Sequence, residues 1–417
     1  MKQILDLHIH SRFSRACSKQ LTLPNIARWC ERKGIDIVGT GDFTHPAWLQ
    51  EIKEQLIPVE KGVFALKDGS SKTNFFLSTE LSCIYKKGVR ARRIHLCVFA
   101  PSISAVEKIV AALTERGCNL RSDGRPILGI DAKELLKIFL EIDPDILMVP
   151  AHAWTPWFAV FGSESGFDSL EECFDELAPA IVAIETGLSS DPPMNWQLSA
   201  LDRVFLLSNS DAHSLPNLGR EANVMDFDSV SYPEFVRILR ERDHKRFLFT
   251  IEFFPEEGKY HFDGHRLCGV RLHPKETQKL GGICPQCKKP LTIGVLSRVE
   301  ALADRPHGFK PQNAVPHRSL VPLAEIIAAT LGRGVATKAV KTEYEKILEK
   351  GGNEFSILLD HPVSALRTMT TEEIAEGISR VREGALTILP GYDGEYGTVS
   401  VFSPEERGPR SKQQPLL

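Results

Sequence analysis

The sequence predicts an α/β fold in which a parallel sheet or barrel is followed by a helical C-terminal part. Up to about residue 255, short apolar strand-like stretches alternate with amphipathic helix-like stretches, as in repeated strand–helix units. Side chains that can bind metals recur where these strands end. Beyond residue 310, apolar residues follow helical spacing and glycines stand at the predicted helix ends. These observations also indicate where a site would form, because strand ends carry the sites of α/β barrels.

The composition fits a protein with a sizeable core and more than one domain. The chain has 417 residues, 42% of them hydrophobic and 25% charged, which is ordinary for globular proteins. The net charge of −3 provides no global basic field, so a nucleic-acid partner would need a local patch. Nine mostly isolated cysteines argue against a disulfide framework. No apolar run approaches the roughly 18 residues of a membrane helix, and no signal-peptide layout opens the chain, so we expect a cytoplasmic protein without a membrane partner.

The alternating region can be divided into elements by its residue patterns. Residues 23–34 form the clearest helix, which is amphipathic and ends in a glycine. Further helices are expected at 47–56, 104–117 and 131–142. Strands are expected at 3–10, 35–42, 74–80, 93–100, 145–152, 180–186 and 203–213.

Potential metal ligands gather at the ends of these strands. Because residues two apart on a strand share a face, His8 and His10 can hold one ion together. Any one such residue could instead be a core histidine or a helix cap, but the whole set favours a metal centre. The predicted ligands, all at or just past strand ends except His95 near a strand start, are His8, His10, Asp42, His45, Glu80, His95, His152, Glu185, Asp211 and His213.

These ligand types point to hydrolysis but leave the metal open. Imidazoles and carboxylates suit zinc, manganese or iron, and magnesium is a further alternative. Paired ions clamp the attacking and leaving oxygens of a phosphate and lower the pKa of a bound water. The sequence contains no glycine-rich nucleotide-binding loop and no Ser-His-Asp signature. We therefore expect a metal-bound hydroxide to be the nucleophile.

A second metal site is expected between residues 256 and 310. Two pairs of ligands with the same spacing suit a tetrahedral structural zinc ion, which would stabilise a loop-rich segment that buries little core. His261 and His273 are alternative fourth ligands, and a thiol pair without metal is the other interpretation. The four predicted zinc ligands are His265, Cys268, Cys284 and Cys287.

The C-terminal part is predicted to be helical up to its tail. Residues 319–332 and 335–352 show helical apolar spacing with glycine stops, and residues 370–384 begin with a capping box. The tail from residue 403 has the composition of a disordered segment. Its last five residues, QQPLL, resemble the short peptides that dock on bacterial sliding clamps, although such a tail can also end in leucines by chance.

Several motifs resemble those of the polymerase and histidinol phosphatase (PHP) superfamily. The resemblance implies a distorted seven-stranded β/α barrel, two or three metal ions at the C-terminal ends of its strands, and phosphoester hydrolysis. The matching motifs are DLHIHS, GIDIVGTGD, the glutamate of STE, RIHLCVFA, VPAH and SNSDAH.

The resemblance also implies a role for each ligand. His8 and His10 would bind the first metal together with Asp211, and Glu80 would bridge two metals. These four residues would form the catalytic core. The residues that would hold the second metal and complete the set are His95, His152 and His213.

Two stretches depart from the superfamily pattern. Phe43 stands where a histidine is usual, and His45 follows two residues later. The loop at 11–19 contains neither acid nor histidine, so a third metal would be weakened or held differently. The basic side chains of this loop, which could meet phosphate oxygens or form an exposed basic surface, are Arg12, Arg15 and Lys19.

Over roughly residues 1–400 the chain resembles the endonuclease Q family. This implies a catalytic barrel at 1–255, a zinc-binding segment at 256–310, a helical DNA-binding domain at 311–402 and a tail at 403–417. It implies a metal-dependent DNA repair endonuclease that incises double-stranded DNA on the 5′ side of deaminated bases (uracil, hypoxanthine or xanthine) or of abasic sites. The strings that carry the resemblance include HSRFSRACSKQLTLPNIA, GTGDFTHPAWL, ETGLSSDPPMNW, SNSDAHSLPNLGREAN and CPQCKKPLTIGVLSRVEALADRP.

An enzyme of this kind must extrude the damaged base to reach it. Trp154, Trp157 and Phe158 could stack on that base or belong to the core. Arg220, within the SNSDAHSLPNLGREAN string, is also assigned to DNA binding. The chief alternative is a small-molecule PHP phosphatase of the histidinol-phosphate type, and a non-catalytic DNA-binding module is a third interpretation.

Overall fold

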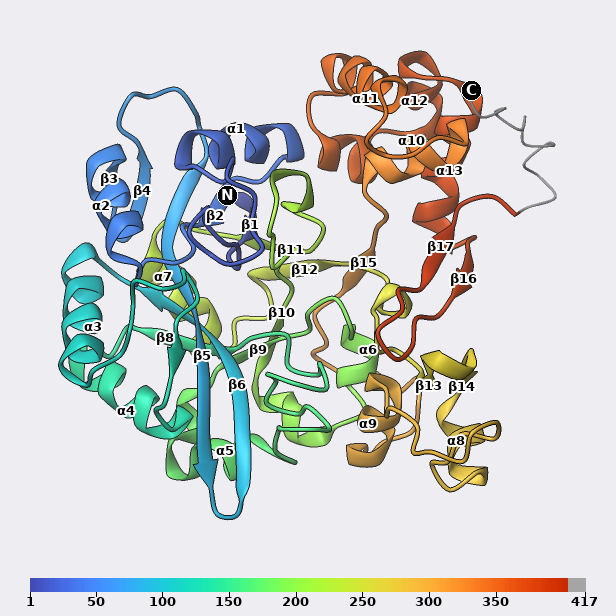
Figure 1. Ribbon diagram of the computed structural model, residues 1–417. Coiled ribbons are helices and arrows are strands. Elements are labelled where there is room, and N and C mark those ends of the chain that lie inside the picture. Colours follow the sequence, from blue (N-terminus) through green and yellow to red (C-terminus); the bar gives the residue numbers. More distant parts are fainter. Residues whose placement is uncertain (404–417) are drawn as a thin grey trace, which may run out of the picture.

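A computed structural model describes residues 1–403 of the chain, and its main feature is a large mixed sheet (Figure 1). A separate strand pair, β9 and β10, runs beside it, and two short hairpins lie further along the chain. The strands are β1 (Lys2–Asp6), β2 (Ile37–Gly39), β3 (Leu56–Glu60), β4 (Val63–Leu66), β5 (Asn74–Lys87), β6 (Arg90–Ala100), β7 (Ile127–Leu128), β8 (Leu147–Pro150), β9 (Ala183–Glu185), β10 (Phe205–Leu207), β11 (Ala222–Asp226), β12 (Phe247–Glu252), β13 (Asp263–His265), β14 (Val270–Leu272), β15 (His317–Ser319), β16 (Thr387–Leu389) and β17 (Thr398–Ser400).

The sheet is mixed where the sequence predicts a parallel one. Its order is β15-β12-β11-β1-β2-β5-β4-β3, with β6 and β7 also paired to β5, and β8 paired to β6. The neighbours β1–β2 and β2–β5 are parallel, whereas β1–β11, β11–β12 and β5–β6 are antiparallel. The difference arises because hairpins such as β5–β6 return directly, and apolar strand patterns alone do not reveal strand direction.

The helices fall largely where apolar periodicity places them. In α1, Gly34 takes a left-handed conformation with φ of 88° and closes the helix, as predicted. In α13, the side chain of Thr371 accepts a hydrogen bond from the backbone of Ile374, as expected for a capped start. The α-helices are α1 (Leu23–Lys33), α2 (Pro46–Gln55), α3 (Ile103–Glu115), α4 (Ala132–Ile142), α5 (Leu170–Phe174), α6 (Pro192–Asn195), α7 (Tyr232–Arg240), α8 (Pro274–Lys279), α9 (Val295–Leu302), α10 (Leu323–Leu331), α11 (Lys338–Gly351), α12 (Val363–Met369) and α13 (Glu372–Glu383).

One buried cluster gathers side chains from many strands against a single helix. Leu5 of β1, Phe76 of β5 and Phe99 of β6 pack with Tyr232 and Phe235 of α7, all of them fully buried. The Tyr232 hydroxyl donates to the carbonyl of Phe99 at 2.9 Å, so its polar end is satisfied inside the core. This core holds the strands together and leaves the polar residues at their other ends free to form a site.

The C-terminal half forms two groups beside the sheet (Figure 1). Helices α10 to α13 form one group, and the β13–β14 hairpin lies with α8 and α9 in the other, with β16 and β17 between them in the view. The helical group is attached to α1 by a buried ion pair, in which Lys33 Nζ lies 2.8 Å from Glu354 Oε2. The Tyr344 hydroxyl donates to the same carboxylate oxygen at 2.7 Å.

Two further predictions concern the C-terminal tail and the crossing of a membrane. The predicted disordered tail and its QQPLL clamp peptide lie, beyond residue 403, outside the described residues. Within residues 1–403, none of the helices has the length and apolar character needed to cross a membrane.

Candidate metal centre

The site begins where β1 ends. His8 and His10 follow Asp6, and both are almost completely buried. The Asp6 carboxylate accepts hydrogen bonds from the backbone N–H groups of Ser210 at 3.0 Å and Gly219 at 2.9 Å. This tie fixes the loop that carries Asp211 against the end of β1.

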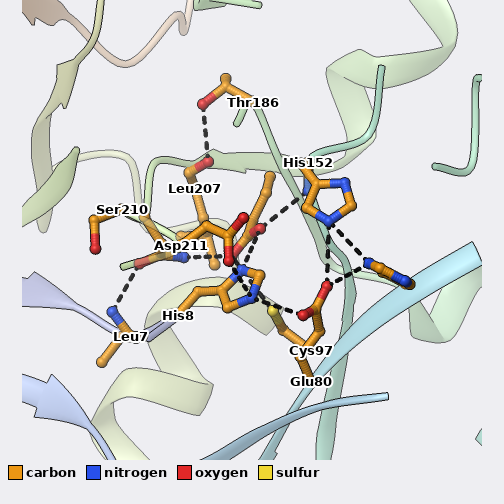
Figure 2. Close-up of polar contacts among 12 residues, drawn as sticks. Leu7, His8, Glu80, Cys97, His152, Thr186, Leu207, Ser210 and Asp211 are labelled. Atoms are coloured by element: carbon orange, nitrogen blue, oxygen red, sulfur yellow. Dashed lines mark hydrogen bonds and ion pairs between the residues drawn. The ribbon is translucent and has the colours of Figure 1, made fainter. Parts of the chain in front are cut away.

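The first group of ligand atoms belongs to His8, His10, Glu80 and Asp211. Figure 2 shows His8, Glu80 and Asp211 of this group. His10 Nε2 lies 3.1 Å from Asp211 Oδ1 and 3.2 Å from Glu80 Oε2, and His8 Nε2 lies 3.5 Å from the same Glu80 oxygen. The Nε2 atom of His8 is buried and has no hydrogen-bond partner among the described residues. A buried polar atom without a partner is costly, so this nitrogen fits a metal ion as its missing partner.

A second group shares the carboxylate of Glu80. Glu80 Oε1 lies 2.7 Å from His95 Nδ1 and 3.2 Å from His152 Nε2. Burial lowers the pKa of His95 to about 4, so its imidazole stays neutral near pH 7, as a metal ligand must. Glu80 therefore faces one ligand group with each oxygen, which is the position that a bridging carboxylate requires.

Two predicted ligands lie behind the histidine rings and not in the ligand groups around Glu80. Asp42 Oδ1 lies 3.0 Å from His10 Nδ1, and Glu185 Oε2 lies 2.9 Å from His8 Nδ1. Carboxylates in this position fix the tautomer and orientation of a metal-binding imidazole. Asp42 also accepts hydrogen bonds from the backbone and hydroxyl of Ser11, so its oxygens are fully used. Although burial raises it, the pKa of Asp42 lies below its ordinary value because the neighbouring His10 ring and the hydrogen bonds from Ser11 favour the charged carboxylate.

His45 and His213 lie outside both ligand groups. The ring of His45 stacks on Phe13 with 4.5 Å between centroids, at the start of α2. His213 Nδ1 is 2.8 Å from the carbonyl oxygen of Asp211, and its ring lies 4.6 Å from that of His10. Phe43 is buried in the core, so its position is used for packing.

Three site residues adopt positive φ angles that non-glycine residues rarely take. These angles are 47° at Asp42, 47° at Asp211 and 29° at His152. Such strain persists only where the surroundings hold the backbone in place. At Asp211 the holding group is Arg220, which donates from Nε to the carbonyl of Ser210 at 2.8 Å and from a terminal nitrogen toward that of Asp211 at 3.4 Å.

Two residues that the sequence analysis missed also reach the site. Cys97 is buried, and its Sγ atom lies 3.5 Å from Glu185 Oε1. Together with His8 and Glu185 it forms a further group of potential metal ligands. A signal for it existed, because Cys97 is two residues from His95 on β6 and so shares its face. Arg125 lies 3.0 Å from Glu80 Oε2 through a guanidinium nitrogen, and its loop position carries no periodic signal.

The cluster opens onto a cavity of about 480 Å³. His152, Glu185 and Asp211 line one side of it. Residues lining the rest of the cavity include Phe253, Tyr260, Lys259 and, from the segment before β17, Tyr396 and Gly397. The cavity is thus polar at the metal cluster and partly aromatic elsewhere.

The predicted DNA-stacking residues behave differently from one another. Trp154 is fully buried and donates from its ring nitrogen to Asn195 Oδ1 at 2.7 Å, which favours the alternative that it belongs to the core. Trp157 is 36% exposed and lies 5.6 Å from the ring of Tyr260, a residue of the cavity wall. Phe158 packs 4.7 Å from the ring of His95.

The basic loop after β1 is partly engaged within the chain. Arg12 pairs with Glu51 at 2.6 Å, and Lys19 donates to the carbonyl of Arg12 at 3.1 Å. The side chain of Arg15 is exposed, while its backbone N–H donates to Asp123.

The four predicted zinc ligands come together near β13. One ligand atom from each lies within 4.8 Å of every other, and His265 Nδ1 is 3.3 Å from Cys287 Sγ. Burial raises the pKa of Cys284, but backbone N–H donors of Cys287 and Gln286 lower it to about 7, which favours a thiolate. His261 and His273 are not part of this group, and His273 caps α8 instead. The residues therefore fit a tetrahedral zinc ion.

Comparison with known proteins identified a matching family model and related proteins in two organisms. Residues 322–385 match the family model of the MJ0043 C-terminal domain. An uncharacterised protein of Methanocaldococcus jannaschii, MJ0043, is 35% identical over 64% of this chain, which spans about a third (34%) of that relative's length. YqxK of Bacillus subtilis is 29% identical over 96% of this chain and 100% of its own.

Two solved structures match almost end to end. The lesion-specific endonuclease PfuEndoQ of Pyrococcus furiosus has a TM-score of 0.85 and 33% identity, over 96% of this chain and 95% of its own. An endonuclease Q complex with a 27-mer duplex substrate that has an abasic lesion at the active site has a TM-score of 0.86 and 32% identity, over 99% and 100%. On this evidence the chain belongs to the endonuclease Q family.

Proposed function

We propose that this protein is a metal-dependent DNA repair endonuclease. It hydrolyses the phosphodiester on the 5′ side of a deaminated base (uracil, hypoxanthine or xanthine) or of an abasic site in double-stranded DNA. The observation that carries the proposal is the pair of ligand groups that share Glu80 and open onto a cavity of about 480 Å³. A solved endonuclease Q complex, which matches 99% of this chain, contains a duplex with an abasic lesion. This supports the same substrate class.

In this proposal the ligands divide between two metal positions. His8, His10 and Asp211 would hold one ion, and His95 and His152, which both face Glu80 Oε1, would hold a second. Glu80 belongs to both groups of ligands. Bound zinc, magnesium or manganese ions lower the pKa of water and neutralise charge on the phosphate.

The chain's own residues prepare this site. Glu185 and Asp42 orient the rings of His8 and His10 from behind, which keeps their Nε2 atoms directed at the ligand cluster. Arg220 holds the backbone of Asp211 in its strained conformation. Preorganisation of this kind lets the site act without rearranging in the transition state.

We propose that the cavity receives the extruded nucleotide. Its volume of about 480 Å³ falls within the roughly 300–1,000 Å³ range of small-molecule sites. Phe253 and Tyr260 line it, and aromatic rings there can stack on a base. Trp157 stands next to Tyr260 with part of its ring exposed, so it can occupy space that the base leaves in the duplex.

The remaining parts are assigned to holding the duplex. We propose a catalytic barrel at 1–255, a zinc-binding segment at 256–310 and a DNA-binding helical domain at 311–402. The joint core of β1, β5, β6 and α7 supports a barrel-like closure of the first part. A phosphatase acting on a small molecule would have no use for the added surface of the other two.

The proposal is tested with labelled duplexes that differ at one base. Purified protein is incubated with a duplex carrying one uracil, an abasic site or no lesion, with Mg²⁺, Mn²⁺ or Zn²⁺, and separately with p-nitrophenyl phosphate. We expect metal-dependent nicking on the 5′ side of the lesion only. Hydrolysis of p-nitrophenyl phosphate without any nicking would assign the protein to the small-molecule phosphatases instead.

A further inference from the structure

A loop that is fixed by hydrogen bonds places Arg125 beside the metal cluster. Its backbone N–H donates to Asp123 Oδ1 at 3.1 Å, and the same oxygen accepts from the backbone of Arg15 at 3.2 Å. The preceding residue, Gly124, donates to the carbonyl of Phe13 at 3.2 Å. The segment is therefore fixed to the loop that follows β1.

Gly124 shows how closely this segment approaches the site. A Cβ atom at this position would lie 2.3 Å from Asp42 Oδ2 and 2.4 Å from Ser14 Oγ, so only glycine fits. This close approach places the next side chain, that of Arg125, beside the ligand cluster.

The guanidinium of Arg125 contacts the bridging carboxylate itself. A terminal nitrogen lies 3.0 Å from Glu80 Oε2, the oxygen that also lies 3.2 Å from His10 Nε2. The side chain is 26% exposed, so part of it is accessible to solvent. A guanidinium has five N–H donors in a planar fork, so donors remain for a second anion.

The placement of a fixed positive charge here needs an explanation. Metal ions bound by the Glu80 carboxylate would repel the guanidinium of Arg125. The ion pair with Glu80 therefore does not by itself explain why an arginine occupies this position. A bound phosphate group carries negative charge, which would offset the repulsion between the metal ions and the guanidinium of Arg125. Asp42 and His45 belong to none of the groups of potential metal ligands among the described residues, so they do not form a further metal position beside Arg125.

We infer that Arg125 is a catalytic residue that donates to a non-bridging oxygen of the scissile phosphate. This inference rests on the proposed function, because it takes DNA as the substrate. The guanidinium supplies a third cationic group at the phosphate, beside the two metal positions. It stabilises the charge on the phosphate oxygens as the attacking oxygen forms its bond to phosphorus and the bond to the leaving oxygen breaks.

The first test compares cleavage by Arg125→Ala and Arg125→Lys with the wild-type protein. We expect the single-turnover rate on a uracil duplex to fall by about a hundredfold or more in R125A and by less in R125K, which keeps the charge but loses the fork. The matched control is Arg121→Ala on the same loop, where the side chain is exposed, and it should leave the rate unchanged. Absence of cleavage by the wild-type protein would contradict the proposed function, whereas equal rates in R125A and wild type would contradict this inference alone.

The second test reads the contact without cleavage. Binding of a lesion duplex is measured by fluorescence anisotropy in Ca²⁺, under conditions where gels verify that the DNA stays uncut. Duplexes carry either the native scissile phosphate or a neutral methylphosphonate in its place. We expect each change, R125A or methylphosphonate, to weaken binding up to about tenfold, and the two together to weaken it no more than either alone.

Two outcomes would overturn the inference. Additive effects of R125A and the methylphosphonate would place Arg125 away from that phosphate. Loss of metal from purified R125A, measured by mass spectrometry, would mean that Arg125 acts only by holding Glu80.

Discussion

The Nδ1 atom of His8 lies 2.9 Å from a carboxylate oxygen of Glu185, on the side of the ring opposite the nitrogen that faces Glu80. The other carboxylate oxygen of Glu185 accepts from the side-chain amide of Asn209 at 2.8 Å. Glu185 thus holds His8 in the tautomer that leaves Nε2 free for a metal ion.

Replacing Glu185 with glutamine should weaken metal binding without removing a ligand. Glutamine has a similar shape but lacks the charge that favours this orientation of His8, so we expect metal affinity to fall by about 10–100-fold. Isothermal titration of metal-free protein measures the effect. Glu164→Gln, on an exposed side chain, is the control and should bind metal like the wild type.

Asp211→Asn should separate cleavage from DNA binding. Asp211 Oδ1 is 3.1 Å from His10 Nε2, within the ligand group, so its loss should reduce cleavage by at least about a thousandfold. Affinity for lesion DNA, measured by anisotropy, should stay within a few-fold of wild type. Undiminished cleavage by D211N would show that the active site lies elsewhere.

Arg220 is expected to act by positioning Asp211 and not by gripping DNA. Its guanidinium donates to the carbonyls of Ser210 and Asp211. For Arg220→Gln, which removes the positive charge, we expect kcat to fall by about tenfold or more while the salt dependence of DNA affinity stays unchanged. A shallower salt dependence with unchanged kcat would instead restore the DNA-contact role predicted from the sequence.

Glu252 should make the protein less stable as the pH rises. Burial, reinforced by the charge of Asp191, raises the pKa of Glu252 from 4.5 to about 7, and its side chain is completely buried. The folded state therefore binds more protons than the unfolded state between these values. The stability associated with the protonated carboxyl is fully present below about pH 4.5 and is lost as the pH rises through about 7.

Glutamine at position 252 removes this loss because it does not ionise. We expect Glu252→Gln to exceed wild type in stability at pH 8 by at most about 3 kcal/mol, with little difference at pH 5. Chemical denaturation at both pH values tests this. Glu349→Gln, at an exposed position, should show no such pH-dependent difference.

Cys287→Ser should remove one zinc ion and loosen the segment around it. The thiol lies among three other ligand atoms within 4.8 Å, and a hydroxyl replaces it poorly. We expect one fewer zinc per chain by mass spectrometry and faster hydrogen exchange confined to the zinc segment. Cys118→Ser, outside every ligand group of the described residues, should retain all zinc.

The sequence predicted the residues of the ligand clusters better than it predicted which side chains surround these clusters. His8 and Asp211 follow the ends of β1 and β10 within motifs, as predicted, whereas Glu80 lies in the middle of β5, which continues past the predicted strand end to Lys87. Asp42 and Glu185 stand at strand ends too, yet each lies behind a histidine ring. Position along a strand does not distinguish these two places, because both are reached from the same edge of the sheet.

Other differences arise from loops and from burial. Arg125 enters the site from a loop, where no periodicity marks its direction, so only the structure reveals it. Trp154 and Trp157 are three residues apart in one aromatic stretch, but one is buried and the other partly exposed. The backbone turns directly after this pair, where Phe158 takes a φ of 61°.

The cavity draws its walls from distant parts of the chain, which has a consequence for biosynthesis. His152 and Asp211 are translated long before Tyr396 and Gly397, which line the same cavity. During synthesis the metal ligands are therefore available before the C-terminal part of the cavity wall has been made. A chain arrested before the β16–β17 hairpin would carry the hydrolytic centre without the wall that restricts what reaches it.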